Sequence, residues 1–334
     1  MVKHTRKILV QSLKLLFAAG IIYWLVQSGK LNFASLKNLL SPGTAALALL
    51  LITLNLFLAS ERWRVLINSQ GEKSKPWPIF KLSLIGIFFN FAMPGGVGGD
   101  VVKAFYFSRE LHGSKVIAIT SVLLDRILGL LAMVLLALLV MLYDFNHIVK
   151  IPTLLTLFYF VCAFFISAVL GLALVFSGKV YNSGALSSVL KKLPLSAKLT
   201  KLYESMHLYG KNPMSFVKVI GLSLLSQVCA IMFLVLAGTA AGFPDIPVTT
   251  YFLVAPLGFM ATAIPISPAG VGVGQAAFYF LFNLYIGETT EVGPTTITAY
   301  QVGMFIVSLL GAFFYLRKKD HPKISKIENL DSDL

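Results

Sequence analysis

Charged side chains inside long apolar stretches are the residues of this sequence best suited to chemistry. Asp125 and Arg126 lie well inside the hydrophobic run 116–142, where ionisable groups are costly in lipid and are expected to face the protein interior. Arg126 is the better candidate for binding a phosphate, because its planar guanidinium matches that group. An ion pair between helices is the alternative. Arg62 ends an earlier apolar run, either as an interfacial anchor or as a residue that reaches the same site.

Two Pro- and Gly-rich breaks interrupt apolar stretches, at residues 94–100 and 265–274. Non-helical backbone at membrane depth is tolerated only where it is buried in protein or lines a cavity. Free N–H groups there would attract an anionic group such as a phosphate, although the glycines could also serve only turns and close helix packing. Asp100 begins the helix after the first break, as an N-cap or as an ionisable group near a cavity. The candidate substrate-binding residues of both breaks are Asn90, Gly96, Gly98, Gly99, Asp100, Lys103, Gly270, Gly272 and Gln275.

The composition places these residues in a membrane protein. Of the 334 residues, 57% are hydrophobic and only 13% are charged, whereas about a quarter of a soluble domain is charged. We expect helical spans, because backbone groups in lipid must be satisfied within the segment. Lys14 and the lack of a cleavage site argue that the first run is a retained span, not a signal peptide. Runs long enough to cross a membrane lie near 8–26, 44–60, 116–142, 152–177, 214–241 and 295–316.

The distribution of Lys and Arg predicts the topology. The net charge is +14, but the bases gather in short segments between the apolar runs, as the positive-inside rule describes, and not in a patch suited to nucleic acid. If the N-terminus is cytoplasmic and both broken stretches are re-entrant, only Lys30, Lys37 and Lys150 lie outside. We therefore expect an all-α polytopic protein of the cytoplasmic (inner) membrane. It would have about six full spans, two re-entrant helical hairpins and both termini in the cytoplasm.

The two breaks also share a sequence pattern, Pro-x-Gly-Val-Gly, at residues 94–98 and 268–272. Under the predicted topology the second half of the chain repeats the order of the first half upside down. Inverted repeats with broken helices at the midplane are typical of transporters. The expected parts are a first half at 1–145 with a hairpin at 79–111, a second half at 146–319 with a hairpin at 251–286, and a disordered tail at 320–334.

The remaining sequence features do not indicate a catalytic, metal or cofactor site. Residues 196–209 are predicted to form an amphipathic helix that lies either on the anionic inner leaflet or in the cytoplasm as a linker. Cys162 and Cys229 stand apart in apolar runs, and the histidines lack paired ligand spacing. No nucleophile with a base can be assembled, and no ATP-binding motif follows the glycines. We therefore expect no catalytic residue, no metal site and no cofactor.

The sequence resembles a known family at these motifs. The Gly-Gly-Asp element within 90–103 and the Asp-Arg-Ile-Leu-Gly-Leu element at 125–130 resemble the lysylphosphatidylglycerol synthase transmembrane-region family. Arg-Trp at 62–63 and the 265–272 segment fit its pattern, and the resemblance spans about 8–316. It implies a flippase-like bundle that moves a lipid, which is an aminoacylated phospholipid in the best-known members. Those members carry a cytoplasmic aminoacyltransferase domain after the membrane part, whereas the last predicted span here is followed only by a short tail. We therefore expect a stand-alone member that does not synthesise the lipid.

Three positions depart from the pattern of that family. The family usually has Arg where Lys103 stands, an acidic residue where Gln275 stands, and often Arg where Gln301 stands. These departures bear on the identity of the substrate and on any charge-coupled mechanism.

We predict a lipid translocase that moves an anionic or aminoacylated phospholipid, or a lipid-linked intermediate, through a cavity between the two hairpins. Two alternatives stay open: a membrane-embedded transferase or its accessory subunit, and an ion or solute transporter. The expected partner is a membrane phospholipid as the substrate. A separate lipid-modifying enzyme and a second copy of the chain are further candidate partners, and nucleic acid is not one.

Overall fold

The described part of the protein is helical throughout. The computed structural model describes Gly20, Tyr23, Gln27, Lys37 and residues 39–92, 98–110, 115–184, 196–264 and 266–317. The predicted first span at 8–26, apart from Gly20 and Tyr23, and the predicted tail at 320–334 lie outside these residues. The helices are α2 (Pro42–Ser69), α3 (Pro76–Ala92), α4 (Gly98–Glu110), α5 (Lys115–Tyr143), α6 (Phe145–Ile148), α7 (Pro152–Phe176), α8 (Gly178–Ser183), α10 (Ser196–Tyr209), α11 (Pro213–Ala240), α12 (Val248–Thr262), α13 (Val273–Ile286) and α14 (Val292–Leu316), with the 3₁₀ turn η2 (Pro268–Gly270).

Five of these helices, α2, α5, α7, α11 and α14, are long and apolar enough to cross a membrane. They confirm the predicted runs at 116–142, 152–177, 214–241 and 295–316, and the beginning of the run at 44–60. The helix α2 continues beyond the predicted run to Ser69. Several of the long helices begin with proline, whose missing N–H is no loss at the first helical position. The chain is therefore a multi-pass helical membrane protein.

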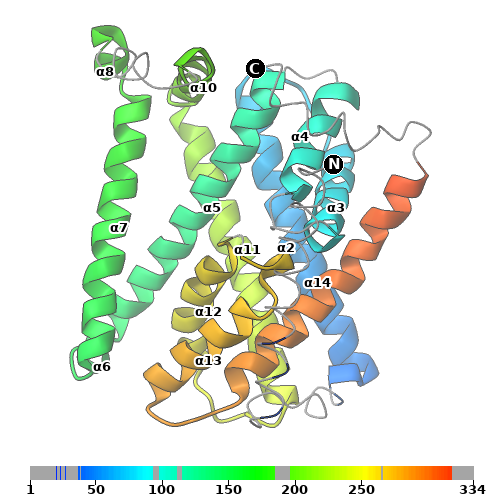
Figure 1. Ribbon diagram of the computed structural model, residues 1–334, viewed down its shortest axis with the longest axis vertical. Coiled ribbons are helices and arrows are strands. Elements are labelled where there is room, and N and C mark those ends of the chain that lie inside the picture. The colour runs from blue at the N-terminus through cyan, green and yellow to red at the C-terminus, as the bar shows by residue number, and fades with distance from the viewer. Residues whose placement is uncertain are drawn as a thin grey trace, which may run out of the picture.

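Two helical hairpins occupy opposite halves of the molecule. The α3–α4 hairpin lies in the upper half of Figure 1 and the α12–α13 hairpin in the lower half, on either side of the central pair α2 and α11. The last spanning helix, α14, packs on α3, while α5 packs on α12. The turn η2 contacts α3, so the inner ends of the two hairpins meet near the middle of the molecule.

Glycines let the helices of each hairpin cross closely. A Cβ placed on Gly99 of α4 would lie 1.9 Å from the carbonyl oxygen of Gly86 on α3. In the second hairpin, a Cβ on Gly258 would lie 2.2 Å from Cε2 of the Phe278 ring. The two helices of each hairpin are therefore tightly packed against each other.

The predicted amphipathic helix is present as α10, Ser196–Tyr209. Its apolar face packs on the protein, because Met206 and Tyr209 are buried in a cluster with residues of α2, α5, α7 and α11. The hydroxyl groups of Ser205 and Thr120, on α5, are 3.0 Å apart. This packing favours the linker role over a helix whose apolar face lies in the leaflet.

Candidate functional site: a polar cavity between two hairpins

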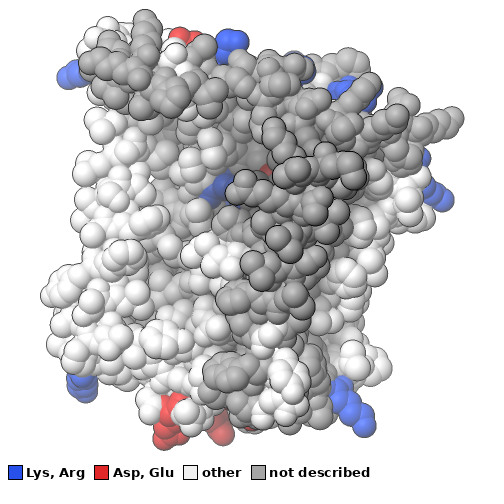
Figure 2. Space-filling model, viewed as in Figure 1, with Lys and Arg blue, Asp and Glu red and all other residues white. Residues whose placement is uncertain are grey.

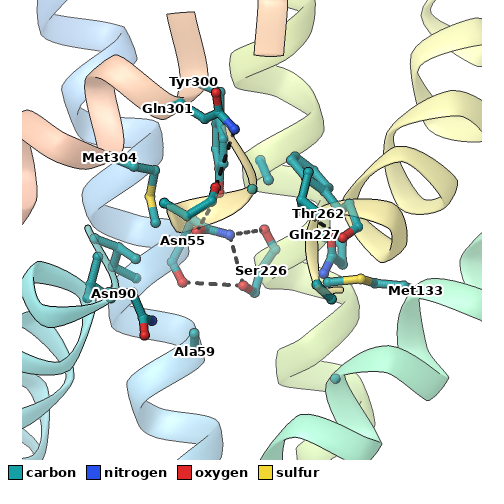
Figure 3. A pocket seen from close by; sticks show the side chains of 18 of the residues that line it. Asn55, Ala59, Asn90, Met133, Ser226, Gln227, Thr262, Tyr300, Gln301 and Met304 are labelled. Carbon is teal, nitrogen blue, oxygen red and sulfur yellow. Dashed lines mark hydrogen bonds between the residues drawn. The ribbon is translucent and has the colours of Figure 1, made fainter. Parts of the chain in front are cut away.

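A cavity of about 400 Å³ lies where the inner ends of the two hairpins meet the spanning helices α2, α5, α11 and α14. Figure 3 shows Asn55 and Ser226 at its centre, with Gln227 and Thr262 on the side opposite Asn90. This cavity brings together residues far apart in the sequence. Its polar lining residues are Asn55, Arg62, Asn90, Arg126, Ser226, Gln227, Thr262, Tyr300 and Gln301.

The first basic residue of the cavity, Arg62, belongs to a charged cluster formed by Arg62, Lys103 and Asp125. Arg62 Nε donates to Asp125 Oδ1 at 2.7 Å, and Lys103 Nζ lies 3.8 Å from Asp125 Oδ2. The three side chains are 12%, 11% and 9% exposed, respectively. Two cations therefore share one carboxylate in a buried position, and Arg62 is the member of the cluster that reaches the cavity wall.

Neighbouring residues hold the charged cluster in place. A Cβ on Gly129 of α5 would lie 2.8 Å from Arg62 Nη1, so only a glycine lets the guanidinium approach so closely. Lys103 Nζ lies 4.1 Å from the centre of the Trp63 ring, a cation–π contact. Trp63 itself is fully buried and donates to Ser121 Oγ at 3.1 Å. The Trp63 ring is therefore packed inside the protein, next to the charged cluster.

The second basic residue, Arg126, forms an ion pair with Asp100. Asp100 is the third residue of α4, which begins at Gly98, so it is not the N-cap. A carboxylate in the first turn still interacts favourably with the helix dipole. The Arg126 side chain is 37% exposed and lines the cavity. Figure 2 shows a basic side chain about midway along the face, with further charged groups at the two ends of the molecule.

Asn90 joins the inner ends of α3 and α4. Its Oδ1 accepts a hydrogen bond from the Gly99 N–H at 3.0 Å, and the residue also lines the cavity. The asparagine therefore satisfies one of the free N–H groups that begin α4. Gly98 and Gly99 do not line the cavity, because they serve the start of α4 and its contact with α3. Gly96 lies outside the described residues.

The second break has unusual backbone conformation. Ala269, Gly270 and Gly272 have φ values of 48°, 71° and 86°, in the left-handed region that glycine adopts without strain. Gly270 lines the cavity together with Ala269, whereas Gly272 lies outside the lining.

Gln275, which the sequence placed at the cavity, is buried behind it. Its Oε1 accepts from the Gly272 N–H at 2.7 Å, and its Nε2 donates to Gln301 Oε1 at 2.7 Å and to Thr298 Oγ1 at 3.0 Å. The amide therefore caps α13 and binds α14, and both of its N–H donors are already engaged. Gln301 lines the cavity instead and donates to the Ala269 carbonyl at 3.3 Å.

Sequence reasoning missed the uncharged polar residues, here called the neutral wall: Asn55, Ser226, Gln227 and Tyr300. Asn55 Nδ2 donates to the Ser226 carbonyl at 2.7 Å and to Ser226 Oγ at 2.9 Å, and the Tyr300 hydroxyl donates to Asn55 Oδ1 at 3.3 Å. The helical spacing carried a signal, because Asn55 stands two turns before Arg62 on one face of α2.

An apolar groove adjoins the cavity. The groove has a volume of about 410 Å³ and lies between α5, α7 and the end of α12. Leu130 and Ala263 line both the groove and the cavity. The groove also contains Phe164 and Ile264, residues that are 40% and 52% exposed. The arrangement therefore offers a polar site for a charged group next to an apolar surface for hydrocarbon chains.

Among the predicted site residues that the structure describes, those that line the cavity are Arg62, Asn90, Arg126 and Gly270. The charged residues Asp100, Lys103 and Asp125 lie behind them as ion-pair partners. Within the described ranges, no group of three or more His, Cys, Asp or Glu side chains is arranged to hold a metal.

A family model described as lysylphosphatidylglycerol synthase TM region matches residues 11–311. No curated protein and no solved structure matches the chain.

Proposed function

The chain belongs to the lysylphosphatidylglycerol synthase transmembrane-region family, and we propose on this premise that it is a lipid translocase of the cytoplasmic membrane. Family membership and five apolar spanning helices make it a membrane protein with a lipid-related role. The proposed substrate is an anionic or aminoacylated phospholipid or a lipid-linked intermediate. A separate lipid-modifying enzyme would supply any aminoacylated form.

The contact between the cavity and the apolar groove is the observation that carries this proposal. A lipid headgroup would bind beside Arg62 and Arg126, while its acyl chains follow the groove past Leu130 and Ala263. Such a groove supports a lipid substrate over a small ion or solute, since a solute path needs walls that exclude hydrocarbon. Arginine suits the phosphate, because its guanidinium presents paired donors to two phosphate oxygens.

The packing of the helices supports an inverted repeat. The α3–α4 hairpin packs on α14 and the α12–α13 hairpin packs on α5, while α2 and α11 pack on each other. Exchanging α2, α3, α4 and α5 with α11, α12, α13 and α14 reproduces the same set of contacts. We propose that the halves at 1–145 and 146–319 are related in this way. Both hairpins would then be re-entrant, and the site could open to either leaflet in turn.

An exchange of ion-pair partners is the proposed binding step. Arg62 and Lys103 share the Asp125 carboxylate, so a phosphate that enters beside Arg62 competes with Asp125 for the guanidinium. Lys103 remains to pair with Asp125 when Arg62 turns to the headgroup. The Asp125 carboxylate would therefore stay paired in both states, which avoids a buried charge without a partner. Transport by this route is passive or coupled to an ion, with Asp100 and Asp125 as the candidate proton carriers.

Transbilayer movement of fluorescent phospholipid in liposomes that contain the purified protein tests this function. Lipid should become accessible to a membrane-impermeant quencher faster than in protein-free liposomes. Arg62→Gln should slow this movement at least about tenfold, since a hydrogen bond to a charged group contributes about 1.5–3 kcal/mol. Arg64→Gln is the matched control, because Arg64 pairs with Glu61 at 2.6 Å and lies off the cavity lining.

Gel filtration of each variant separates a loss of transport from a loss of folding. If phospholipids, including aminoacylated forms, move no faster than in protein-free liposomes, the translocase proposal fails.

A further inference from the structure

The cavity has two walls of different chemistry. The basic wall presents Arg62 and Arg126, and the neutral wall presents the amides of Asn55 and Gln227 and the hydroxyl of Tyr300. Figure 3 shows the neutral side chains converging from α2, α11 and α14. Among the described residues that line the cavity, none is Asp or Glu. The site is therefore positive or neutral on every described side.

The nearest carboxylates are already engaged. Asp100 pairs with Arg126, and Asp125 is shared by Arg62 and Lys103. An ammonium group in the cavity would lose its water beside two arginines without a carboxylate facing it. Burial of like charges side by side is unfavourable. A headgroup that carries a cationic aminoacyl group is therefore a poor fit, whereas a phosphate is a good one.

The neutral wall has hydrogen-bonding capacity to spare. The Gln227 side chain lies within the cavity lining and its residue is 6% exposed. In the described part of the chain its Oε1 has no hydrogen-bond donor, and a buried amide oxygen without a donor is unfavourable. Because Oε1 has almost no exposed surface, the amide must rotate to present it to the cavity, and a hydroxyl group of the ligand would then supply the donor.

The two hairpins differ in charge in the same way as the two walls of the cavity. The third residue of α4, Asp100, pairs with Arg126 on α5, and the third residue of α13, Gln275, pairs with Gln301 on α14. Related positions thus carry an ion pair on the basic side of the cavity and an amide pair on the neutral side. At the position of Gln275, which corresponds to Asp100, the neutral side therefore has an amide in place of a carboxylate.

We propose that this cavity selects an anionic phospholipid whose headgroup beyond the phosphate is uncharged and bears hydroxyl groups, such as a glycerol or a sugar, over one with a cationic aminoacyl group. The phosphate binds Arg62 and Arg126, and the hydroxyl groups donate to Gln227 Oε1 and exchange hydrogen bonds with Tyr300. This inference rests on the proposed function for the identity of the cavity as a headgroup site.

Binding of short-chain lipids to the detergent-solubilised protein tests the selectivity without transport. The probes are dioctanoyl phosphatidylglycerol, its lysyl ester, and dioctanoyl phosphatidylmethanol, which lacks the hydroxyl groups. Thermal unfolding as a function of lipid concentration should give about tenfold tighter binding for phosphatidylglycerol than for the other two, the equivalent of one good hydrogen bond or one avoided charge contact. Equal or tighter binding of the lysyl ester overturns the proposal.

Two variants sharpen the test. Gln227→Glu places a carboxylate in the cavity and should shift the preference toward the lysyl ester, whereas Gln70→Glu, at the far end of α2 and off the cavity lining, should leave it unchanged. Gln227→Leu should bring the affinity for phosphatidylglycerol down to that for phosphatidylmethanol. If the preference of Gln227→Leu equals that of the unchanged protein, the role of the neutral wall is refuted.

The transport assay with the same headgroups separates this inference from the proposed function. Movement of all headgroups at one rate leaves the translocase standing and overturns the selectivity. Selective binding without any transbilayer movement supports the selectivity and refutes the translocase.

Discussion

The α3–α4 and α12–α13 hairpins approach one cavity from opposite ends of the molecule, yet different forces hold them. In the first hairpin, α4 is tied to α5 by the Asp100–Arg126 pair and by the contact of Lys103 with Asp125. In the second, α13 is tied to α14 by the amide pair Gln275–Gln301. Equivalent attachments are therefore ionic on one side and neutral on the other.

Because one hairpin is attached by ion pairs and the other by an amide pair, we expect the two to respond differently to a charged substrate. In the proposed binding step, the ion pairs around Arg62 and Arg126 would change partners, because a phosphate competes with the carboxylates for the same guanidinium groups. Amide pairs respond little to a distant charge, since their interaction is short-ranged. We therefore infer that the first hairpin senses the headgroup while the second is a fixed support.

The largest effect is expected from the charged cluster. Asp125→Asn leaves Arg62 and Lys103 buried without their carboxylate, and breaking a buried pair typically costs about 3–5 kcal/mol. We expect a large fall in the thermal unfolding midpoint of the detergent-solubilised protein. Asp245→Asn, in the exposed loop between α11 and α12, is the matched control and should change the midpoint little. Equal midpoints for the two variants would contradict the role of the cluster.

The next largest effect concerns the glycine contact of the first hairpin. Gly99→Ala places a Cβ 1.9 Å from the Gly86 carbonyl oxygen, and overpacking of this kind costs about 1–3 kcal/mol or more. Gly43→Ala, whose Cβ has no neighbour within 4 Å, should be neutral or stabilising. Gly274→Ala in the second hairpin should lie between them, because its nearest neighbour, Thr262 Cγ2, is 3.0 Å away and on a side chain. The reverse order would refute the close backbone contact of Gly99 with Gly86 as a source of stability.

A smaller effect is expected from the amide pair of the second hairpin. Gln275→Met keeps the side-chain length but removes the acceptor for Gly272 and the donor to Gln301, which should cost about 1–2 kcal/mol. Unfolding midpoints at low and high salt measure whether the attachment is neutral. The difference from the unchanged protein should be the same at both salt concentrations. A difference that shrinks in high salt would reveal an ionic attachment.

The smallest effect is expected from the exposed ion pair. A double-mutant cycle on Asp100→Asn and Arg126→Gln should give a coupling of up to about 1 kcal/mol, because solvent screens a pair with an exposed member. Arg126 is 37% exposed, and the coupling should weaken as the salt concentration rises. A coupling as large as the effect of Asp125→Asn would mean that this pair, and not the buried cluster, holds the hairpin.

The sequence predicted the helices better than it predicted the site. Long apolar runs determine where helices can cross the membrane. The ends of most predicted spans therefore lie within a few residues of the helix ends in the structure. The exception is α2, whose end was placed at residue 60 because Arg62 and Arg64 interrupt the apolar run. In the structure Asp125 and Glu61 pair with these arginines, so the helix continues to Ser69.

For the site, charge was the useful signal and hydrogen-bonding geometry was the missing one. Arg62 and Arg126 stood out because charges are rare in apolar runs, and both line the cavity. Gln275 and Gln227 could not be told apart from sequence. Only the fold shows that the Gln275 amide turns back to Gly272, whereas Gln227 lies in the cavity lining.

Photocrosslinking of a phospholipid with a photoactivatable headgroup reports where the headgroup binds in the protein. With the purified protein in liposomes, we predict labelled peptides from α2 around Arg62, from α11 around Gln227 and from α14 around Gln301. Arg62→Gln should weaken this labelling, and Arg64→Gln should leave it intact. Labelling confined to the lipid-facing surface of α7 or to the ends of the helices, with none at the three cavity-lining segments, would contradict the account.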